Sequence, residues 1–347
     1  MELRRFGRIG LQVPKLVFGA TSLGNLFRAV PHEEKAALVE AWTRVDWRPL
    51  VIDSAGKYGA GMSLQTIGEQ LQRLAVPPEE VLISNKLGWR QVPLAGPQQS
   101  FEPDAWFELT HDAVLDISYD GILRCWEQGN RLMGGYTAAL VSVHDPDEYL
   151  RQADTPEMRR RLRQHIVDAY RALVELRDAG QAKAVGMGAK DWRTIKELAD
   201  DCDLDWIMLA NSFTVMKHPA ELAEFMHDLA RRGVAIINSA LFHGGFLLGG
   251  ELFDYRRLDA ANPSDRQLLE WRRRFSECCH RLGYSPFDVG VAFGLSHPAV
   301  TSVALSSSRA DRLADHVAAV NQRIEPSVWR EFMRAGLIAE HCDFLGC

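Results

Sequence analysis

The sequence lacks the features that would place a protein in a membrane, in the secretory pathway or on nucleic acid. It contains no apolar run of about 18 residues, so we expect no transmembrane helix and no membrane partner. Its first five residues do not begin a signal peptide, which favours a cytoplasmic location. Lys and Arg number 40 against 46 Asp and Glu, and this net charge of −6 offers no basic surface for nucleic acid.

Cysteine is scarce, and its spacing argues against a disulfide framework. The six cysteines include no CxxC pair: Cys125, Cys202, Cys278, Cys279, Cys342 and Cys347. Reduced thiols in a cytosolic protein fit this pattern better. Cys278, Cys279 and His280 are consecutive, but neighbours on a helix point about 100° apart and rarely bind one ion together. We therefore predict no metal site.

A Rossmann-type dinucleotide site and a divided chain are also disfavoured. No Gly-x-Gly-x-x-Gly segment follows a strand-like run and opens a helix. The composition, 46% hydrophobic and 25% charged, is that of a globular protein with a large core. No linker interrupts the chain, so we predict a single domain over residues 1–347.

Short β-rich runs alternate with helical segments along the whole chain. Eight runs are predicted strands: residues 16–20, 50–53, 81–86, 138–144, 182–187, 206–211, 234–239 and 300–305. Several are almost entirely apolar, which is typical of parallel strands covered on both faces. Helical spacing of apolar residues is clear at 33–45, 63–74 and 168–179. Eight such strands with intervening helices predict an α/β fold, a (β/α)8 TIM barrel.

Two segments lie outside this repeat, and two loops within it are unusually long. Residues 4–13 are predicted to form a β-hairpin that closes the bottom of the barrel, and residues 325–337 an additional helix. The loops at 88–116 and 242–265 are long and follow predicted strands. Both should therefore lie at the C-terminal rim, where barrel enzymes bind their ligands.

Ionisable residues stand at or just beyond predicted strand ends: Asp53, Tyr58, Lys86 and His144. A barrel directs these ends into one pocket, so we expect the four side chains to meet. A phenol has an intrinsic pKa of about 10, and the Lys86 ammonium would lower it by stabilising the phenolate. Asp53 would then hold Lys86, while His144 orients a substrate oxygen. Each residue alone also fits a structural role, so their joint placement carries the hypothesis of proton transfer coupled to hydride transfer.

Three segments resemble motifs of the aldo-keto reductase family: DSAGKYG at 53–59, SNK at 84–86 and VHDPD at 143–147. The resemblance extends over essentially the whole chain. It implies a nicotinamide-dependent oxidoreductase in which Tyr58 is the general acid/base. The resemblance further implies that Lys86 and Asp53 adjust the pKa of the phenol and that His144 orients the substrate.

Further segments resemble the bacterial sugar-dehydrogenase branch of this family: FGATSLGNL at 18–26, ISYDG at 117–121 and GLI at 336–338. That branch includes D-threo-aldose (L-fucose-type) 1-dehydrogenases, galactose-type dehydrogenases and pyridoxal dehydrogenases. The resemblance implies oxidation of the anomeric carbon of a sugar to a lactone, or reduction of a carbonyl. The expected partner is a small carbonyl compound or sugar, and the oligomeric state stays open.

The segment after the last predicted strand is the expected binding site for the cofactor phosphates. A helix begins there, and its N–H groups and the hydroxyls of Ser306 and Ser308 suit a phosphate. By resemblance, Arg309 and Arg312 contact the adenosine 2′-phosphate or the adenine. These arginines lead us to expect NADP. Ser306 replaces a Lys common in strict NADPH members, which makes the site less committed to the additional phosphate and leaves NAD as the alternative. Simple N-capping by Ser308 beside two exposed arginines is the competing interpretation.

The other cofactor-binding candidates also lie near strand ends: Gly19, Thr21, Lys190, Asn211, Asn238 and Ser239. By resemblance, Lys190 replaces an Asn that holds the nicotinamide amide, and Asn238 replaces a Tyr that stacks on the ring. Asn211 offers a substitute hydrogen bond to the carboxamide. Lys190 has a second interpretation as a surface residue without a role.

Substrate-pocket candidates come from the rim segments. The principal ones are Asn25, Trp89 and His243, with Phe27, Trp106 and Phe107 beside them. Aromatic rings offer apolar faces to the CH groups of sugars, although core packing explains any single Trp equally well. A second functional class also stays open, a nucleotide-sensing barrel with little turnover like the potassium-channel β subunits.

Overall fold

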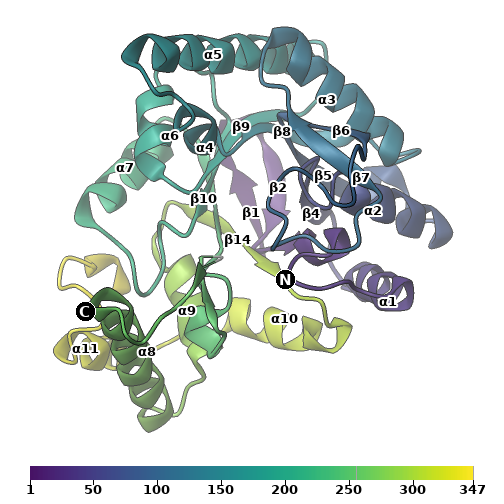
Figure 1. The fold of residues 1–347 in the computed structure, drawn as a ribbon. Coiled ribbons are helices and arrows are strands. Elements are labelled where there is room, and N and C mark those ends of the chain that lie inside the picture. The colour runs from purple at the N-terminus through teal and green to yellow at the C-terminus, as the bar shows by residue number, and fades with distance from the viewer. Residues whose placement is uncertain (255, 347) are drawn as a thin grey trace.

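Eight parallel strands close into a barrel in the computed structural model, which describes residues 1–254 and 256–346 (Figure 1). Around the barrel they follow their order in the chain: β3 (Leu16–Gly19), β4 (Leu50–Ala55), β5 (Val81–Leu87), β8 (Ala138–His144), β9 (Ala184–Ala189), β10 (Trp206–Ala210), β11 (Ala235–Ser239) and β14 (Val300–Ser306). The predicted (β/α)8 barrel is confirmed.

The predicted strand bounds agree with the structure to within about two residues. The largest shift concerns the strand predicted at 182–187, which forms β9 two residues later. The N–H groups of Gln181 and Ala182 donate to the Leu176 carbonyl at the end of the preceding helix. These residues therefore complete a helix end before the sheet ladder starts at Ala184.

Helices surround the barrel (Figure 1). They are α1 (His32–Thr43), α2 (Met62–Arg73), α3 (Tyr119–Leu132), α4 (Pro146–Leu150), α5 (Pro156–Asp178), α6 (Trp192–Leu198), α7 (Ala220–Arg231), α8 (Pro263–Arg281), α9 (Pro286–Ser296), α10 (Leu313–Asn321) and α11 (Pro326–Arg334). The prediction at 168–179 covered only the second half of α5. This helix begins after Thr155, whose hydroxyl accepts a hydrogen bond from the Met158 N–H at 3.1 Å.

The N-terminal hairpin closes the bottom of the barrel, as predicted. Strands β1 (Leu3–Phe6) and β2 (Leu11–Pro14) place Phe6 and Val13 in one apolar cluster with inward-facing strand residues. The ring centroids of Phe6 and Trp206 lie 6.3 Å apart. A Cβ at Gly186 would stand 2.2 Å from the Trp206 indole, so this strand position requires glycine. The lower half of the interior is therefore packed with side chains.

The two long rim loops contain structure of their own. The first forms a hairpin of β6 (Trp89–Pro93) and β7 (His111–Leu115). The second holds the short pair β12 (Leu252–Phe253) and β13 (Arg256–Arg257) before α8. Both are extensions of strand ends, and both therefore stand over the same end of the barrel.

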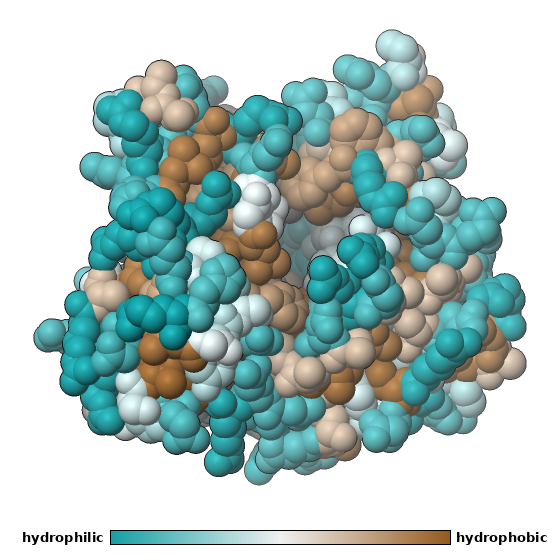
Figure 2. All heavy atoms as spheres, turned by 90° about the horizontal axis from the view of Figure 1, so that it is seen from below, coloured by the Kyte–Doolittle hydropathy of each residue, from teal (hydrophilic) through white to brown (hydrophobic). Residues whose placement is uncertain are grey.

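The surface is mainly polar. Figure 2 shows one side of the molecule, where hydrophilic residues predominate, apolar residues occur in small groups, and a recess divides the upper part. Large apolar side chains exposed within the described ranges are Leu3, Phe107 and Leu248. No helix of the described residues has the length and apolar character needed to cross a bilayer.

The cysteines lie in the interior. Four buried residues carry free thiols: Cys125, Cys202, Cys278 and Cys279. Burial raises the pKa of the thiols of Cys125, Cys202 and Cys279 to about 12. Cys342 is buried as well, and Cys347 lies outside the described residues.

Candidate active site

Asp53 and Lys86 form a buried ion pair inside the barrel. Strands β4 and β5 run side by side with Asp53 opposite Ser84. The Lys86 ammonium donates to Asp53 Oδ2 in a short contact, and the Ser84 hydroxyl donates to Asp53 Oδ1 at 3.1 Å. The side chain of Lys86 is only 4% exposed, and that of Asp53 is only 5% exposed. Each charge is therefore compensated by a partner on the adjacent strand.

Tyr58 and His144 complete the group that the sequence predicted. Tyr58 follows β4, and the Lys86 Nζ atom lies 4.8 Å from the centroid of its ring. The His144 imidazole, at the end of β8, stands edge-on to the same ring with centroids 5.7 Å apart. All four predicted side chains thus meet at one point, although they come from three strands and a loop.

His144 is a neutral imidazole in this setting. Burial and the nearby charges of Lys86 and Lys57 hold the pKa of His144 well below its usual value. Its Nδ1 atom has no hydrogen-bond partner within the described residues. A neutral imidazole has one N–H donor and one acceptor nitrogen, so it can orient a hydroxyl or carbonyl oxygen.

A second charged group, which sequence reasoning missed, borders the first. Lys57 precedes Tyr58, and its ammonium donates to Glu148 Oε2 on α4 at 3.2 Å. Lys190, after β9, donates to Glu148 Oε1 at 2.5 Å. Lys190 therefore lies in an ion-pair network near His144. The signal available in the sequence was the position of Lys57 inside the same segment as Asp53 and Tyr58.

Asp147 lies on α4 beside this network. Its burial, together with the charge of Asp145, raises the pKa of Asp147 to about 6. The backbone N–H of Asp191 donates to its Oδ2 atom at 3.2 Å. Asp147 is thus an acidic group whose ionised form is only partly compensated, whereas the pKa of the adjacent Glu148 is lowered, with Lys57 and Lys190 favouring its charge against the effect of burial.

Three predicted cofactor residues meet where β14 joins β3. The hydroxyls of Thr21 and Ser306 lie 2.8 Å apart, and Ser306 also donates to the Gly19 carbonyl at 3.1 Å. A Cβ at Gly19 would approach the Ser306 Cβ to 3.1 Å. The hydroxyls of Thr21 and Ser306 can form hydrogen bonds with a polar ligand at the rim of the barrel.

The arginines that follow β14 are exposed. Arg309 pairs with Asp311, and Arg312 with Asp315 at 2.8 Å. The competing interpretation is right that the two arginines are exposed, but its N-cap by Ser308 is wrong, because neither η5 (Ala310–Arg312) nor α10 has a side-chain cap. Instead the neighbouring hydroxyl, of Ser307, accepts a hydrogen bond from the Arg309 N–H at 3.0 Å. Among the described residues, the acidic partners of both guanidinium groups lie two or three positions along the chain, and both groups are exposed to solvent.

The amide side chains at the ends of β10 and β11 differ in direction. Asn238 is fully buried, and its Nδ2 atom donates to the carbonyls of Phe213 and Gly294. These bonds fix the Asn238 side chain in the wall between β11 and α9, while its Oδ1 atom has no partner among the described residues. Its contact with the cofactor stays a prediction. Asn211 is also buried, and its Oδ1 atom likewise has no partner in the described part of the chain. Ser239 donates to the Leu209 carbonyl at 3.0 Å.

Two predicted substrate residues instead fasten the rim. Asn25 donates to the Phe107 carbonyl at 2.9 Å and accepts from the Val30 N–H at 3.1 Å, so its amide is occupied. His243 is 1% exposed and contacts the Thr214 hydroxyl at 3.0 Å and the Asp254 carboxylate at 3.1 Å. Neither side chain is available to a ligand. Their hydrogen-bond partners Phe107, Thr214 and Asp254 are distant in the sequence, so the position of the two residues near strand ends did not reveal them.

Aromatic side chains from the first rim loop pack near Tyr58. Trp89 lies 5.4 Å from the ring of Phe101, and the Lys57 ammonium stands 5.0 Å above the Trp89 ring. Trp106 stacks on Tyr58 with ring centroids 5.7 Å apart. Of the predicted substrate residues, Trp89 and Trp106 thus lie with Tyr58 in one aromatic cluster.

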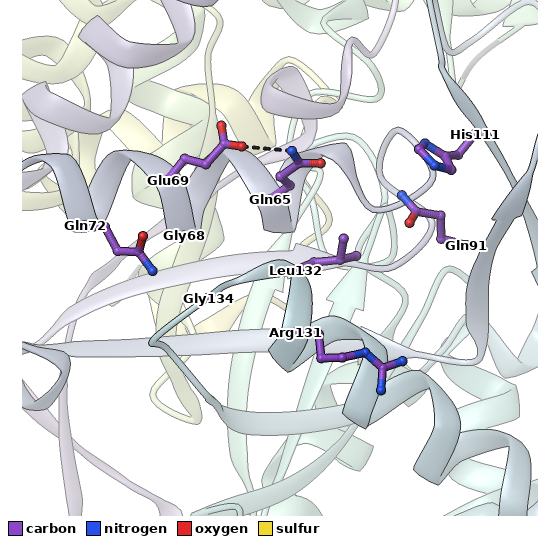
Figure 3. Close-up of a pocket in the computed structure, with 9 residues that line it drawn as sticks. All are labelled: Gln65, Gly68, Glu69, Gln72, Gln91, His111, Arg131, Leu132 and Gly134. Atoms are coloured by element: carbon purple, nitrogen blue, oxygen red, sulfur yellow. Dashed lines mark hydrogen bonds between the residues drawn. The ribbon is translucent and has the colours of Figure 1, made fainter.

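A separate groove of about 430 Å³ lies outside the barrel (Figure 3). It is formed by α2, the end of α3 and the β6–β7 hairpin, and Gln65 donates there to Glu69 at 2.8 Å. None of the four converging residues lines it. Within the described ranges, no group of His, Cys, Asp and Glu is arranged to hold a metal ion.

Comparison with known proteins points to one family. Residues 15–335 match the model of the aldo/keto reductase family. A pyridoxal 4-dehydrogenase from Microbacterium luteolum is 29% identical over 351 residues, covering 97% of this chain and 98% of that protein. A D-threo-aldose 1-dehydrogenase from a Pseudomonas species is 27% identical over 333 residues, covering 95% and 96%. The predicted resemblance to the sugar-dehydrogenase branch is confirmed.

Solved structures share the fold. A glycerol dehydrogenase from Gluconobacter oxydans superposes with a TM-score of 0.67 at 17% identity, over 96% of this chain and 95% of that one. An aldo-keto reductase from Bacillus halodurans, in its holo form, gives a TM-score of 0.69 at 17% identity, over 96% of each chain. These similarities establish the barrel architecture alone.

Proposed function

The chain belongs to the aldo/keto reductase family, and we propose that it interconverts the hemiacetal of an aldose, or a small aldehyde, with the corresponding lactone or alcohol. It is an oxidoreductase, and nicotinamide cofactors serve this family. The observation that carries the proposal is the placement of the Lys86 ammonium, held by Asp53, against the ring of Tyr58.

Tyr58 is the proposed general acid/base. In oxidation, its phenolate oxygen takes the proton of the substrate hydroxyl while the carbon atom loses a hydride. In reduction, the phenol returns that proton to the carbonyl oxygen. Lys86 stabilises the negative charge on the phenolate, and Asp53 keeps the ammonium in place.

His144 orients the reacting oxygen. Because its imidazole is neutral at neutral pH, it does not add a second positive charge beside Lys86. Its N–H donor can hold the substrate oxygen close to the Tyr58 hydroxyl without competing for the proton. The edge-on contact of the two rings supports this assignment.

The residues of the rim fit a nicotinamide dinucleotide. Asn211 Oδ1 is buried without a partner among the described residues, and a carboxamide N–H would satisfy it. Arg309 and Arg312 are the groups we assign to the adenosine 2′-phosphate, so we propose NADP as the preferred cofactor and NAD as the alternative. When bound, the nicotinamide ring supplies the site that accepts or donates the hydride.

The proposed substrates are small and cyclic. Two relatives are named for pyridoxal and for aldoses, and the cluster of Tyr58, Trp89 and Trp106 offers apolar ring faces beside the reacting group. Aromatic faces suit both the CH groups of a sugar and a flat heterocycle.

A spectrophotometric screen tests the proposal. The purified protein is mixed with NAD or NADP and a set of aldoses, pyridoxal and small aldehydes, and formation or loss of the reduced nicotinamide is followed. We expect turnover with at least one aldose or pyridoxal, faster with NADP. Binding of the cofactor without turnover of any compound would contradict the proposal and favour a nucleotide-sensing barrel.

A further inference from the structure

Trp106 covers one face of Tyr58 from the first rim loop. The indole is 3% exposed and stacks on the phenol with an interplanar angle of 28°. The backbone on both sides of it is fastened to the loop after β3. The Phe27 N–H donates to the Ala105 carbonyl at 2.7 Å, and the Phe107 N–H donates to the Asn25 carbonyl at 3.2 Å.

One carboxylate connects this indole to the residue that precedes Tyr58. Glu102 Oε1 accepts a hydrogen bond from the Lys57 ammonium at 2.7 Å, and its Oε2 accepts one from the Trp106 N–H at 2.8 Å. The Lys57 side chain is 5% exposed, and its buried charge is compensated by Glu102 together with Glu148 on α4. Glu102 is thereby the link between the rim loop and the backbone at Tyr58.

We propose that Glu102 is a positioning residue that holds Tyr58 against Lys86 through Trp106 and Lys57. The inference rests on the proposed role of Tyr58 in proton transfer. A phenol ring turns about two bonds, and a displacement of about 1 Å at a reacting group lowers rates by about 100-fold. Glu102 restrains the ring through the stacked indole and through the preceding residue.

The groups that face Tyr58 come from three elements. Lys86 approaches from β5, with Asp53 of β4 behind it, and His144 approaches from β8. Trp106 covers the ring from the rim loop and carries no charge. A shift of the Tyr58 ring away from Lys86 therefore changes the electrostatic environment of the phenol. A loss of packing that leaves the distance between these two groups unchanged does not.

The principal test is Glu102→Gln. The amide keeps the shape but has one acceptor oxygen, so it cannot serve both the ammonium and the indole N–H. For oxidation we expect kcat to fall about 10-fold with KM changed less than about twofold. We also expect the midpoint of the kcat–pH profile to move to higher pH, because the phenolate loses its close ammonium.

Trp106→Phe offers an independent variant that keeps an aromatic ring but removes the N–H together with the pyrrole part of the indole. We expect it to resemble Glu102→Gln, and the double variant to lose no more than about the larger single loss, since both break one connection. Glu80→Gln is the matched control. Glu80 has similar exposure, 39% against 35%, and accepts from Arg48 at 2.6 Å, but it precedes β5 at the opposite end of the barrel.

The outcomes separate this inference from the proposed function. Ultraviolet difference titration against Tyr58→Phe follows ionisation of the phenol without any substrate, and Glu102→Gln should move it to higher pH. If the wild-type protein lacks turnover but this shift occurs, the positioning role stands and the function fails. An unchanged pH midpoint, or additive losses in the double variant, would overturn the positioning role.

Discussion

The two sides of the barrel mouth are built on different principles. At the ends of β4 and β5, the charges of Asp53 and Lys86 are buried and paired with each other, and a neutral His144 stands beside them at the end of β8. After β14, Arg309 and Arg312 are exposed and paired with acids two or three residues along the chain. We call these the catalytic side and the arginine side.

The difference in burial determines how firmly the side chains are held on each side. Buried ion pairs persist only with complete partners, so the catalytic side has one stable arrangement. Exposed pairs contribute little and exchange partners easily, so an arginine can leave its aspartate for a ligand phosphate. The reaction type is thus determined by a preorganised group, while cofactor preference depends on adaptable side chains.

The most severe break of the catalytic side is Tyr58→Phe. We expect turnover to fall by about 10³-fold, because the proton donor–acceptor is removed, while cofactor binding stays nearly unchanged. Steady-state kinetics and titration of cofactor fluorescence measure the two quantities. Turnover near the wild-type rate would refute the assignment of Tyr58.

Lys86→Met should reveal the cost of an uncompensated buried charge. Asp53 would lose its counter-ion, and we expect the free energy of unfolding to drop by about 3–5 kcal/mol. Urea denaturation measures it. The double variant Asp53→Asn/Lys86→Met should recover most of this loss, and Arg309→Ala, on the arginine side, should leave stability almost unchanged. Equal effects on the two sides would contradict the comparison.

Asp147→Asn tests the acidic crowding near His144. The folded-state pKa of Asp147 is raised to about 6, so the folded protein binds a proton that the unfolded chain has released. Asp147 therefore lowers stability as the pH rises through this range. We expect the variant to be about 3 kcal/mol more stable at pH 7, since the pKa of Asp147 is raised from an ordinary 3.8 to about 6 and one pKa unit corresponds to about 1.4 kcal/mol.

The gain from Asp147→Asn should disappear below the ordinary pKa of an aspartate, where both states are protonated. Urea denaturation at neutral and acidic pH checks this. Asp104→Asn, at an exposed carboxylate, is the control and should show no such dependence. A gain that is constant with pH would argue against an electrostatic cause.

The smallest effect is expected on the arginine side. Arg312→Ala should weaken NADP binding by about fivefold and NAD binding hardly at all, because only NADP has the additional phosphate. Isothermal titration with each cofactor makes the comparison. Arg323→Ala is the control, since Arg323 lies near Glu2 at the hairpin end of the barrel. Equal losses for both cofactors would exclude a role in binding the 2′-phosphate.

For residues close to strand ends, the direction of the side chain could be predicted from the sequence in some cases and not in others. The convergence of Asp53, Lys86 and His144 followed from the barrel, since parallel strand ends meet at one rim. Asn25, Asn238 and His243 also stand near strand ends, yet their side chains bond to protein groups. Periodicity locates a residue along a strand, but the partners that turn its side chain come from distant segments.

The sequence by itself determined the barrel and the meeting of four side chains, because alternation of strands and helices is a local property repeated along the chain. Only the tertiary structure decided which amides remain unsatisfied and how the rim loop reaches Tyr58. Lys57 and Glu102, for example, are 45 residues apart and meet through the packing of a long loop. Such contacts depend on the closure of loops over the barrel, and no local pattern encodes them.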